Sequence, residues 1–191
     1  MVKFIFLLMP TLEAQNFKKV LSDLNKDLRF FKYSCGSDLP EPNDLRWYSA
    51  RILSFEFSDI VPEEVLKASA FGAYNFHPGS PAYPGWSPAL FAAQEGAPVF
   101  GATLHEMTAK VDAGPIVGTE LFQTASPLDQ HQLEKQAYQA SLNLLKRFAP
   151  DLALSPTIPV ATWQSWQGQR RTRRQAALLQ ARLAAQQMTL V

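Results

Sequence analysis

The chain has 191 residues, a formal net charge of +1 and 18% charged residues. This length suits one globular domain, and the balance of acids and bases predicts no bulk attraction to a polyanionic partner. A single cysteine, Cys35, excludes an internal disulfide and fits a reducing compartment. The apolar start Met1–Pro10 is too short for a membrane span. We therefore expect a cytoplasmic protein.

The first half of the chain alternates predicted strands and helices. Phe4–Met9 is a continuous apolar run, typical of a strand buried on both faces. Thr11 could cap the amphipathic helix that is predicted to follow it, and strands are predicted at Leu28–Tyr33 and Arg51–Phe57. Pro62 opens a second helix whose first turn carries two glutamates, which favour the positive end of the helix dipole.

The second half continues this alternation but places two strands in succession. The predicted elements are a strand at Gly72–Phe76, a helix at Ser87–Glu95, strands at Val99–Met107 and Gly118–Phe122, and a long amphipathic helix at Leu128–Phe148. This order predicts an α/β fold with an open sheet, parallel at its front and mixed at its back. No repeat or linker divides the chain, so one domain is expected over residues 1–160.

The last segment, residues 161–191, has a different composition. It contains two tryptophans and four closely spaced arginines: Trp163, Trp166, Arg170, Arg171, Arg173 and Arg174. These residues could stack on bases and contact phosphates, or they could begin a helix that packs on the domain or on a second subunit. Because the chain as a whole is nearly neutral and carries no nucleic-acid-binding module, nucleic acid is not the expected partner. A homodimer remains possible.

Two polar residues follow an apolar run in the stretch YNFHPGSPAYPG, which begins at Tyr74. Strand alternation places Asn75 and His77 on the same side, at the carboxyl end of a strand, where open α/β sheets bind ligands. Pro78 restricts His77 to an extended backbone. The pair could bind an oxyanion; alternatively, His77 could be a hydrogen-bonded histidine of the core.

A second motif, TLHEMTAKVDAGPI, places Asp112 seven residues after His105. A glycine and a proline after Asp112 predict a tight loop that brings one carboxylate to the same edge of the sheet. Taken singly, Asp112 could be an ordinary turn residue and His105 a packed strand residue. Motifs for zinc, Walker-type phosphate binding and serine hydrolases are absent from the sequence, and the first turn, MPTLEAQN, has no glycine for binding a dinucleotide.

Together, the two motifs resemble the folate-dependent formyltransferases. The resemblance covers Asn75–Val117 and is faint before Gly72. It implies a Rossmann-like three-layer fold, mostly parallel with an antiparallel back edge, and catalytic roles for Asn75, His77 and Asp112. It also implies 10-formyltetrahydrofolate as co-substrate and no metal. The residues that it implies for folate binding are Phe57, Ile60, Val61, His105, Val111, Ala113 and Gly114.

The resemblance implies transfer of a formyl group to a primary amine, which is the leading hypothesis. The chain lacks the extra carboxyl-terminal domain of methionyl-tRNA formyltransferase and the phosphate-holding loop of glycinamide ribonucleotide formyltransferase. A small amine or an amino sugar is therefore the expected acceptor. The alternatives are a 10-formyltetrahydrofolate hydrolase, in which water replaces the amine, and a folate- or ligand-binding module without catalysis.

Overall fold

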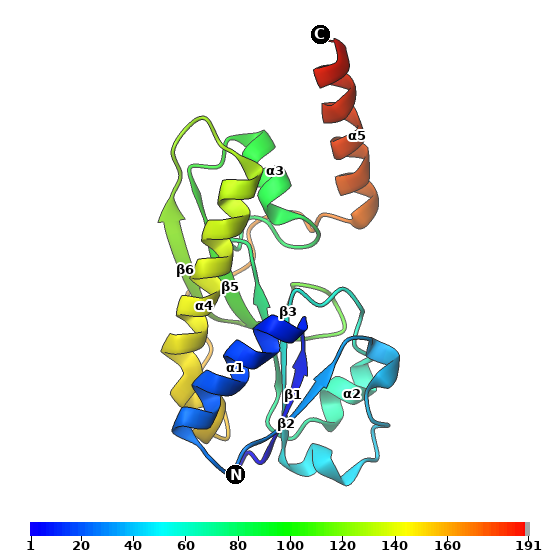
Figure 1. Ribbon diagram of the computed structural model, residues 1–191, viewed down its shortest axis with the longest axis vertical. Coiled ribbons are helices and arrows are strands. Elements are labelled where there is room, and N and C mark those ends of the chain that lie inside the picture. Colours follow the sequence, from blue (N-terminus) through cyan, green and yellow to red (C-terminus); the bar gives the residue numbers. More distant parts are fainter. Residues whose placement is uncertain (190–191) are drawn as a thin grey trace.

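A six-stranded sheet forms the centre of the computed structural model, which describes residues 1–189 (Figure 1). Its strand order is β2-β1-β3-β4-β5-β6. The first four of these strands pair in parallel, whereas β5 is antiparallel to both of its neighbours, β4 and β6. This arrangement confirms the predicted mixed sheet. The strands are β1 (Phe4–Leu8), β2 (Arg29–Tyr33), β3 (Ala50–Phe55), β4 (Ala73–His77), β5 (Val99–Glu106) and β6 (Ile116–Gln123).

Helices cover both faces of this sheet. Helices α1 and α4 lie side by side on one face, and α2 lies on the other (Figure 1). The helices are α1 (Thr11–Leu24), α2 (Glu63–Ala68), α3 (Pro88–Glu95), α4 (Gln130–Leu154) and α5 (Arg173–Thr189), with 3₁₀ turns at Gly36–Asp38 and Leu45–Ser49. Within residues 1–189, no helix combines the length and apolarity needed to cross a membrane.

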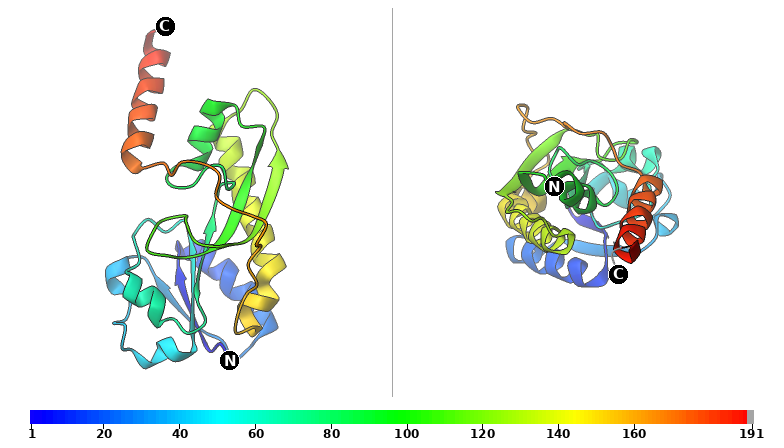
Figure 2. Two further views of the ribbon diagram at one scale, coloured as in Figure 1. Left: turned by 180° about the vertical axis from the view of Figure 1, so that it is seen from behind. Right: turned by 90° about the horizontal axis from the view of Figure 1, so that it is seen from above.

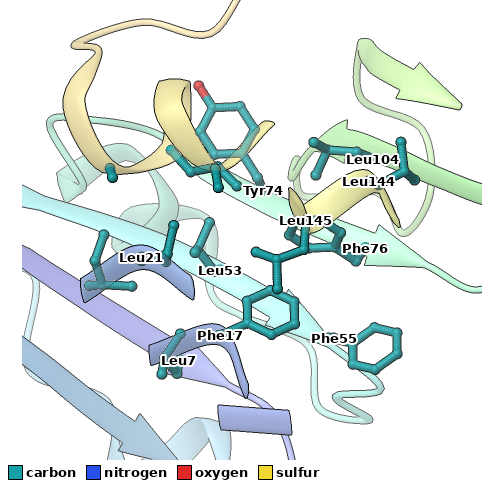
Figure 3. Packing of buried hydrophobic residues seen from close by; sticks show 14 of the residues in the cluster. Leu7, Phe17, Leu21, Leu53, Phe55, Tyr74, Phe76, Leu104, Leu144 and Leu145 are labelled. Carbon is teal, nitrogen blue, oxygen red and sulfur yellow. The ribbon is translucent and has the colours of Figure 1, made fainter. Parts of the chain in front are cut away.

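The alternation of side chains along the central strands separates two apolar layers. Leu53, Phe55 and Phe76 point toward α1 and α4, where Phe17 packs edge-to-face on Phe76 at 5.0 Å between ring centroids (Figure 3). Ile52 and the neighbouring apolar residues of the opposite face pack with α2. Because β1, β3 and β4 are buried on both faces, their polar residues concentrate at the strand ends, where the sheet meets its loops.

Helix α4 extends beyond its predicted end at Phe148 and passes through Pro150 to Leu154. Proline removes one helical hydrogen bond, so the sequence predicts an earlier end. The structure supplies other donors to this turn: the fully buried Arg51 donates to the carbonyls of Asp151 and Leu152, and also to Ser155 just beyond the helix. Burial lowers the pKa of Arg51 to about 10, so the guanidinium remains charged at neutral pH.

Strand β3 ends at Phe55, two residues before its predicted end. Glu56 has a φ of +51°, in the left-handed region, so the extended strand cannot continue through it.

Beyond α4, the chain crosses the sheet on the face opposite α4 and then forms α5, which extends away from the body (Figure 2). Arg171 Nη2 lies 2.6 Å from Glu95 Oε1. The guanidinium carbon of Arg173 lies 4.2 Å from the centroid of the Trp86 ring, and Arg173 also donates to the carbonyl of Ser58. Two of the four clustered arginines therefore contact the domain.

Candidate active site

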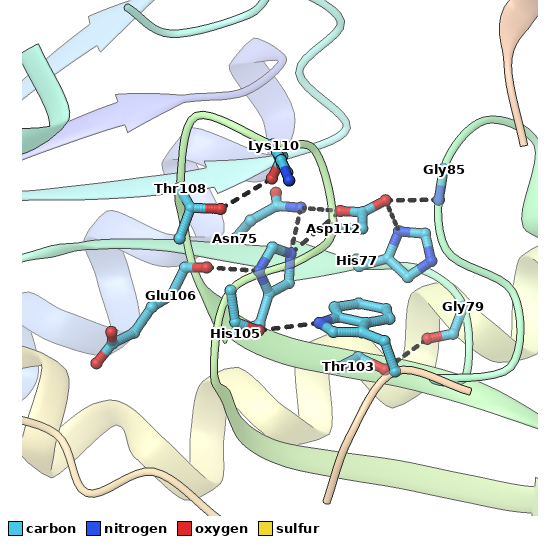
Figure 4. A network of polar contacts seen from close by, with 12 residues as sticks. Asn75, His77, Gly79, Gly85, Thr103, His105, Glu106, Thr108, Lys110 and Asp112 are labelled. Carbon is cyan, nitrogen blue, oxygen red and sulfur yellow. Dashed lines mark hydrogen bonds and ion pairs between the residues drawn. The ribbon is translucent and has the colours of Figure 1, made fainter. Parts of the chain in front are cut away.

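Four polar side chains meet where β4 and β5 pair (Figure 4). Asn75 of β4 lies directly opposite His105 of β5 in the antiparallel ladder, and its Nδ2 lies 3.2 Å from His105 Nε2. His77 is the last residue of β4, and Asp112 lies in the loop between β5 and β6. The structure therefore places Asn75, His77 and Asp112 in one network, together with His105.

Asp112 is the centre of this network. Its Oδ2 accepts a hydrogen bond from the backbone N–H of Gly85 at 2.7 Å and lies 3.3 Å from His77 Nδ1. Its Oδ1 lies 3.2 Å from His105 Nε2 and 3.5 Å from Asn75 Nδ2. The backbone of Asp112 is left-handed, with a φ of +46°, a conformation that costs energy outside glycine and is often found at functional sites.

The network is almost closed to solvent. His77, His105 and Asp112 are 4%, 2% and 7% exposed, and Asn75 is the most accessible member. Burial alone would raise the pKa of Asp112, but His77, His105 and the Gly85 N–H together hold that pKa well below its usual range. Asp112 is therefore a carboxylate at neutral pH.

The proton positions on the two imidazoles are constrained by their neighbours. His105 Nδ1 lies 2.7 Å from the carbonyl of Glu106, which can only accept, so His105 donates there. His77 faces an acceptor at each nitrogen, with Asp112 at Nδ1 and the Tyr83 carbonyl 2.8 Å from Nε2. A neutral ring donates to only one of them. Burial lowers the pKa of His77, whereas Asp112 and the Tyr83 carbonyl favour the charged ring.

These shifts predict that acid destabilises the fold. Asp112 stabilises the folded state above its unfolded pKa of about 3.9, and that contribution is lost as the pH falls. His77 has a lowered pKa when folded, so its unfolded state binds more protons below about pH 6.5 and stability falls there too.

We expect the free energy of unfolding, measured with urea, to decrease from pH 7 to pH 5. The slope should be smaller in His77→Gln. His131→Gln is the matched control, because the side chain of His131 is 88% exposed. A wild-type protein whose stability rises on acidification to pH 5 would contradict the assigned pKa directions.

The residues expected to bind folate, apart from His105 of β5, lie on the loops after β3 and β5 and differ in accessibility. Ile60 is 71% exposed and Val111 is 42% exposed. Val61, in contrast, is buried in the apolar layer beside α2, so its side chain faces the core. Phe57 is half-buried against the same layer, Ala113 is exposed, and His105 belongs to the polar network itself.

Gly114 is a close-approach position in this loop. A Cβ there would lie 2.0 Å from the carbonyl oxygen of Glu106, so only glycine fits without moving the backbone.

A hollow of about 240 Å³ lies at the carboxyl ends of β1, β2 and β3. Its lining residues are Met9, Pro10, Ser34, Glu56, Phe57 and Ser58. Partial desolvation and the neighbouring carboxylates of Glu13 and Glu134 raise the pKa of Glu56, whose side chain is still exposed. A second hollow, of about 280 Å³, lies between the turn at 80–83 and residues 163–167, and no network residue lines it.

In residues 1–189, no group of three or more His, Cys, Asp or Glu side chains is arranged to hold a metal ion.

Three contributors to the site are not predicted by the sequence: the Gly85 N–H, the Tyr83 carbonyl and Trp166. The first two are backbone groups, which carry no signal in side-chain patterns. Trp166 contacts the rings of both His77 and His105 edge-on. Trp163 is 83% exposed. The pattern of residues 161–172 does not distinguish the two tryptophans.

Comparisons with known proteins agree on one family. The sequence profile of the Formyl transferase family matches residues 44–151. The bifunctional polymyxin resistance protein ArnA of Wigglesworthia glossinidia brevipalpis is 32% identical over 117 residues, which cover 56% of this chain and 18% of that protein. The chain thus matches less than a fifth of the length of that curated relative.

Solved structures share the fold at low sequence identity. A 4-N formyltransferase from Francisella tularensis superimposes with a TM-score of 0.76 at 19% identity, covering 91% of this chain and 77% of that chain. The formyltransferase PseJ from Anoxybacillus kamchatkensis, solved with UDP-4,6-dideoxy-4-formamido-L-AltNAc and tetrahydrofolate, gives 0.72 at 18% identity, covering 90% and 86%. Since the family profile matches more than half of its residues, including Asn75, His77, His105 and Asp112, the chain belongs to the formyl transferase family.

Proposed function

We propose that the chain transfers a formyl group from 10-formyltetrahydrofolate to a primary amine of a nucleotide-linked amino sugar, at the site formed by Asn75, His77 and Asp112. The observation that carries this proposal is the network itself: one accessible amide donor backed by a buried carboxylate and two imidazoles. The choice of a sugar is supported by the related PseJ structure, which contains a formamido sugar nucleotide and tetrahydrofolate.

The residues around the network suit a flat heterocycle such as the pterin of folate. The exposed side chains of Ile60 and Val111 offer apolar surface on two loops that follow β3 and β5. Burying them under a bound ring would be favourable, since about 25 cal/mol is gained per Å² of apolar surface removed from water. We assign the acceptor to the hollow at the carboxyl ends of β1, β2 and β3, which Phe57 also lines.

Asn75 is placed to act directly on the reacting carbonyl. Attack of the amine on the formyl carbon forms a C–N bond and an oxyanion, and an amide N–H aimed at this oxygen stabilises it as the charge develops. Asn75 is the most accessible network residue, and one N–H of its Nδ2 is held by His105 Nε2 at 3.2 Å. The other N–H makes only a long contact of 3.5 Å to Asp112 Oδ1 and is the one that turns to the oxyanion. The amide is therefore pre-oriented before the substrate binds.

His77 and Asp112 have different roles in the proton transfer. The low pKa of Asp112 makes this carboxylate a weak base, so its role is to stabilise positive charge nearby. His77, neutral because of burial, is the better acceptor for the proton that the attacking nitrogen loses. The C–N10 bond of the tetrahedral intermediate then breaks, N10 takes up a proton, and tetrahydrofolate and the formamide leave.

Asn75→Ala is expected to lower kcat by roughly 10²–10³-fold, the typical cost of removing one oxyanion donor. The measurement is the rate of tetrahydrofolate release with donor and amine at saturation. Asn143→Ala is the matched control, since Asn143 is exposed on α4. An Asn75→Ala enzyme as fast as the control would exclude Asn75 as the oxyanion donor.

The proposed function itself is tested by supplying 10-formyltetrahydrofolate with and without a panel of primary amines that includes nucleotide-linked amino sugars. Release of tetrahydrofolate that depends on the amine supports formyl transfer. Amine-independent formation of formate would identify a hydrolase, and donor binding without turnover would identify a binding module. Either of the last two results overturns the proposal.

A further inference from the structure

Residues 161–172, which we call the strap, are tied by backbone hydrogen bonds to the two loops that build the site. The strap lies outside the segment matched by the family profile. Ala161 N–H donates to the Ile116 carbonyl at 2.7 Å, at the start of β6. Gln167 N–H donates to the Pro81 carbonyl at 2.9 Å, in the turn that follows His77. The strap therefore joins the loop before β6 to the turn after β4.

Trp166 is the strap residue that reaches the network. Its indole N–H donates to the carbonyl of Gly114 at 2.9 Å, two residues after Asp112. Its ring lies edge-on to His105 and His77, at 5.1 Å and 5.6 Å between ring centroids. One side chain thus contacts both imidazoles that flank Asp112 and the loop that carries it.

The far end of the strap acts on Asp112 from the other side. Arg171 forms a parallel bridge with Gly85: Arg171 N–H donates to the Pro84 carbonyl, and Trp86 N–H donates to the Arg171 carbonyl, both at 2.9 Å. These contacts fix the peptide whose N–H donates to Asp112 Oδ2. A Cβ on Gly85 would lie 2.2 Å from the Arg171 carbonyl oxygen, so the strap leaves no space for another residue there.

We propose that Trp166 is a positioning residue of the formyl transfer site: its N–H holds the Asp112 loop through Gly114, and its ring fixes the imidazoles of His77 and His105 against the carboxylate. This inference rests on the proposed function. It means that one residue of the site lies on the strap, outside the segment that the family profile matches. We assign no positioning role to Trp163, three residues earlier on the same strap, because its side chain is exposed.

The test compares Trp166→Leu and Trp166→Phe with Trp163→Leu and Trp163→Phe. In W166F a ring is kept and the N–H is lost, and kcat should fall about tenfold; in W166L both are lost, and kcat should fall about a hundredfold, the scale expected for a misplacement near 1 Å. The KM for the amine should change much less, because the acceptor contacts are untouched. The Trp163 variants should behave like the wild type.

A second readout needs no substrate: the titration of His77, followed by NMR of its ring nitrogens. The groups that face this ring are Asp112, His105 and the Tyr83 carbonyl, and W166L substitutes none of these residues. Because burial is what lowers the pKa of His77, opening the ring to water should raise its titration midpoint. The Trp163 variants should leave the midpoint unchanged.

Gly168→Ala provides a variant that keeps the indole. A Cβ at Gly168 would lie 1.7 Å from the Ala82 carbonyl oxygen, so the strap must move away from the turn at 80–83. The same rise in the His77 midpoint and the same fall in kcat are expected. If W166L fails to fold, W166F and Gly168→Ala decide the question.

Unchanged kcat in these variants, or an unchanged His77 titration, overturns the proposal. If the wild type transfers no formyl group at all, the proposed function fails, and the titration of His77 in W166L against W163L then decides alone whether Trp166 positions the ring. The two failures are therefore distinguishable.

Discussion

Replacing Asp112 with asparagine is expected to lower kcat for formyl transfer by roughly 10³-fold or more, the scale of loss when a buried carboxylate that orients a histidine is neutralised. Asp112 accepts from His77 and from the Gly85 N–H through one oxygen. An asparagine offers one acceptor oxygen and one NH₂ group, so one side of the network would face a donor where it needs an acceptor. The positive charge that His77 gains when it accepts the proton of the attacking nitrogen would also lose its counter-ion.

The measurement is steady-state kinetics with saturating donor and amine. Asp129→Asn is the matched control, since Asp129 caps the start of α4 by accepting from Gln132 N–H, and asparagine is an equally good helix cap. A D112N enzyme within about threefold of this control would show that the carboxylate charge is not needed, against the role inferred from its lowered pKa.

The largest expected effect on stability belongs to Arg51. Arg51→Met is expected to lower the free energy of unfolding by about 3–5 kcal/mol, the scale of loss when one partner is removed from a buried polar network. The guanidinium donates to the carbonyls of Phe71, Asp151, Leu152, Ser155 and Pro156. Methionine fills similar space but leaves these acceptors without their donor, and each buried acceptor left unsatisfied costs about 1–3 kcal/mol.

Denaturation with urea gives this free energy directly. Arg147→Met is the control, because Arg147 pairs with Glu120 on the surface and exposed pairs contribute little. If R51M lowers the free energy of unfolding no more than R147M does, the carbonyl contacts of Arg51 do not hold the end of α4. The unfolding of R51M should also expose the residues after Leu152 first, since three of the five carbonyls lie there or beyond.

Most of the fold follows from local patterns in the sequence. The buried strands read as continuous apolar runs, and the polar residues at their ends identify the edge that carries the site. The end of α4 could not be predicted, because Pro150 argues locally for an earlier stop. Arg51, which donates to the carbonyls of the last turn, lies about a hundred residues away in the chain. Long-range polar contacts of this kind leave no local signal.

The candidate site likewise combines residues that the sequence predicts with residues that it does not. Asn75, His77 and Asp112 can be selected from their motifs, because side-chain type and spacing carry the chemistry. His105 reads as a folate-binding residue, yet the structure places it in the network, between Asn75 and Asp112. Trp166 contacts the network only because the strap folds back across the sheet, and no pattern in residues 161–172 shows that path.

Following a ¹³C-labelled formyl group from the donor to the product is the most direct test of the central claim. The wild-type protein should move the label from 10-formyltetrahydrofolate into a formamide on the sugar amine, one label for each tetrahydrofolate released, and D112N should not. Label that appears as free formate, or that remains on the folate in the presence of every amine offered, would contradict formyl transfer by this chain.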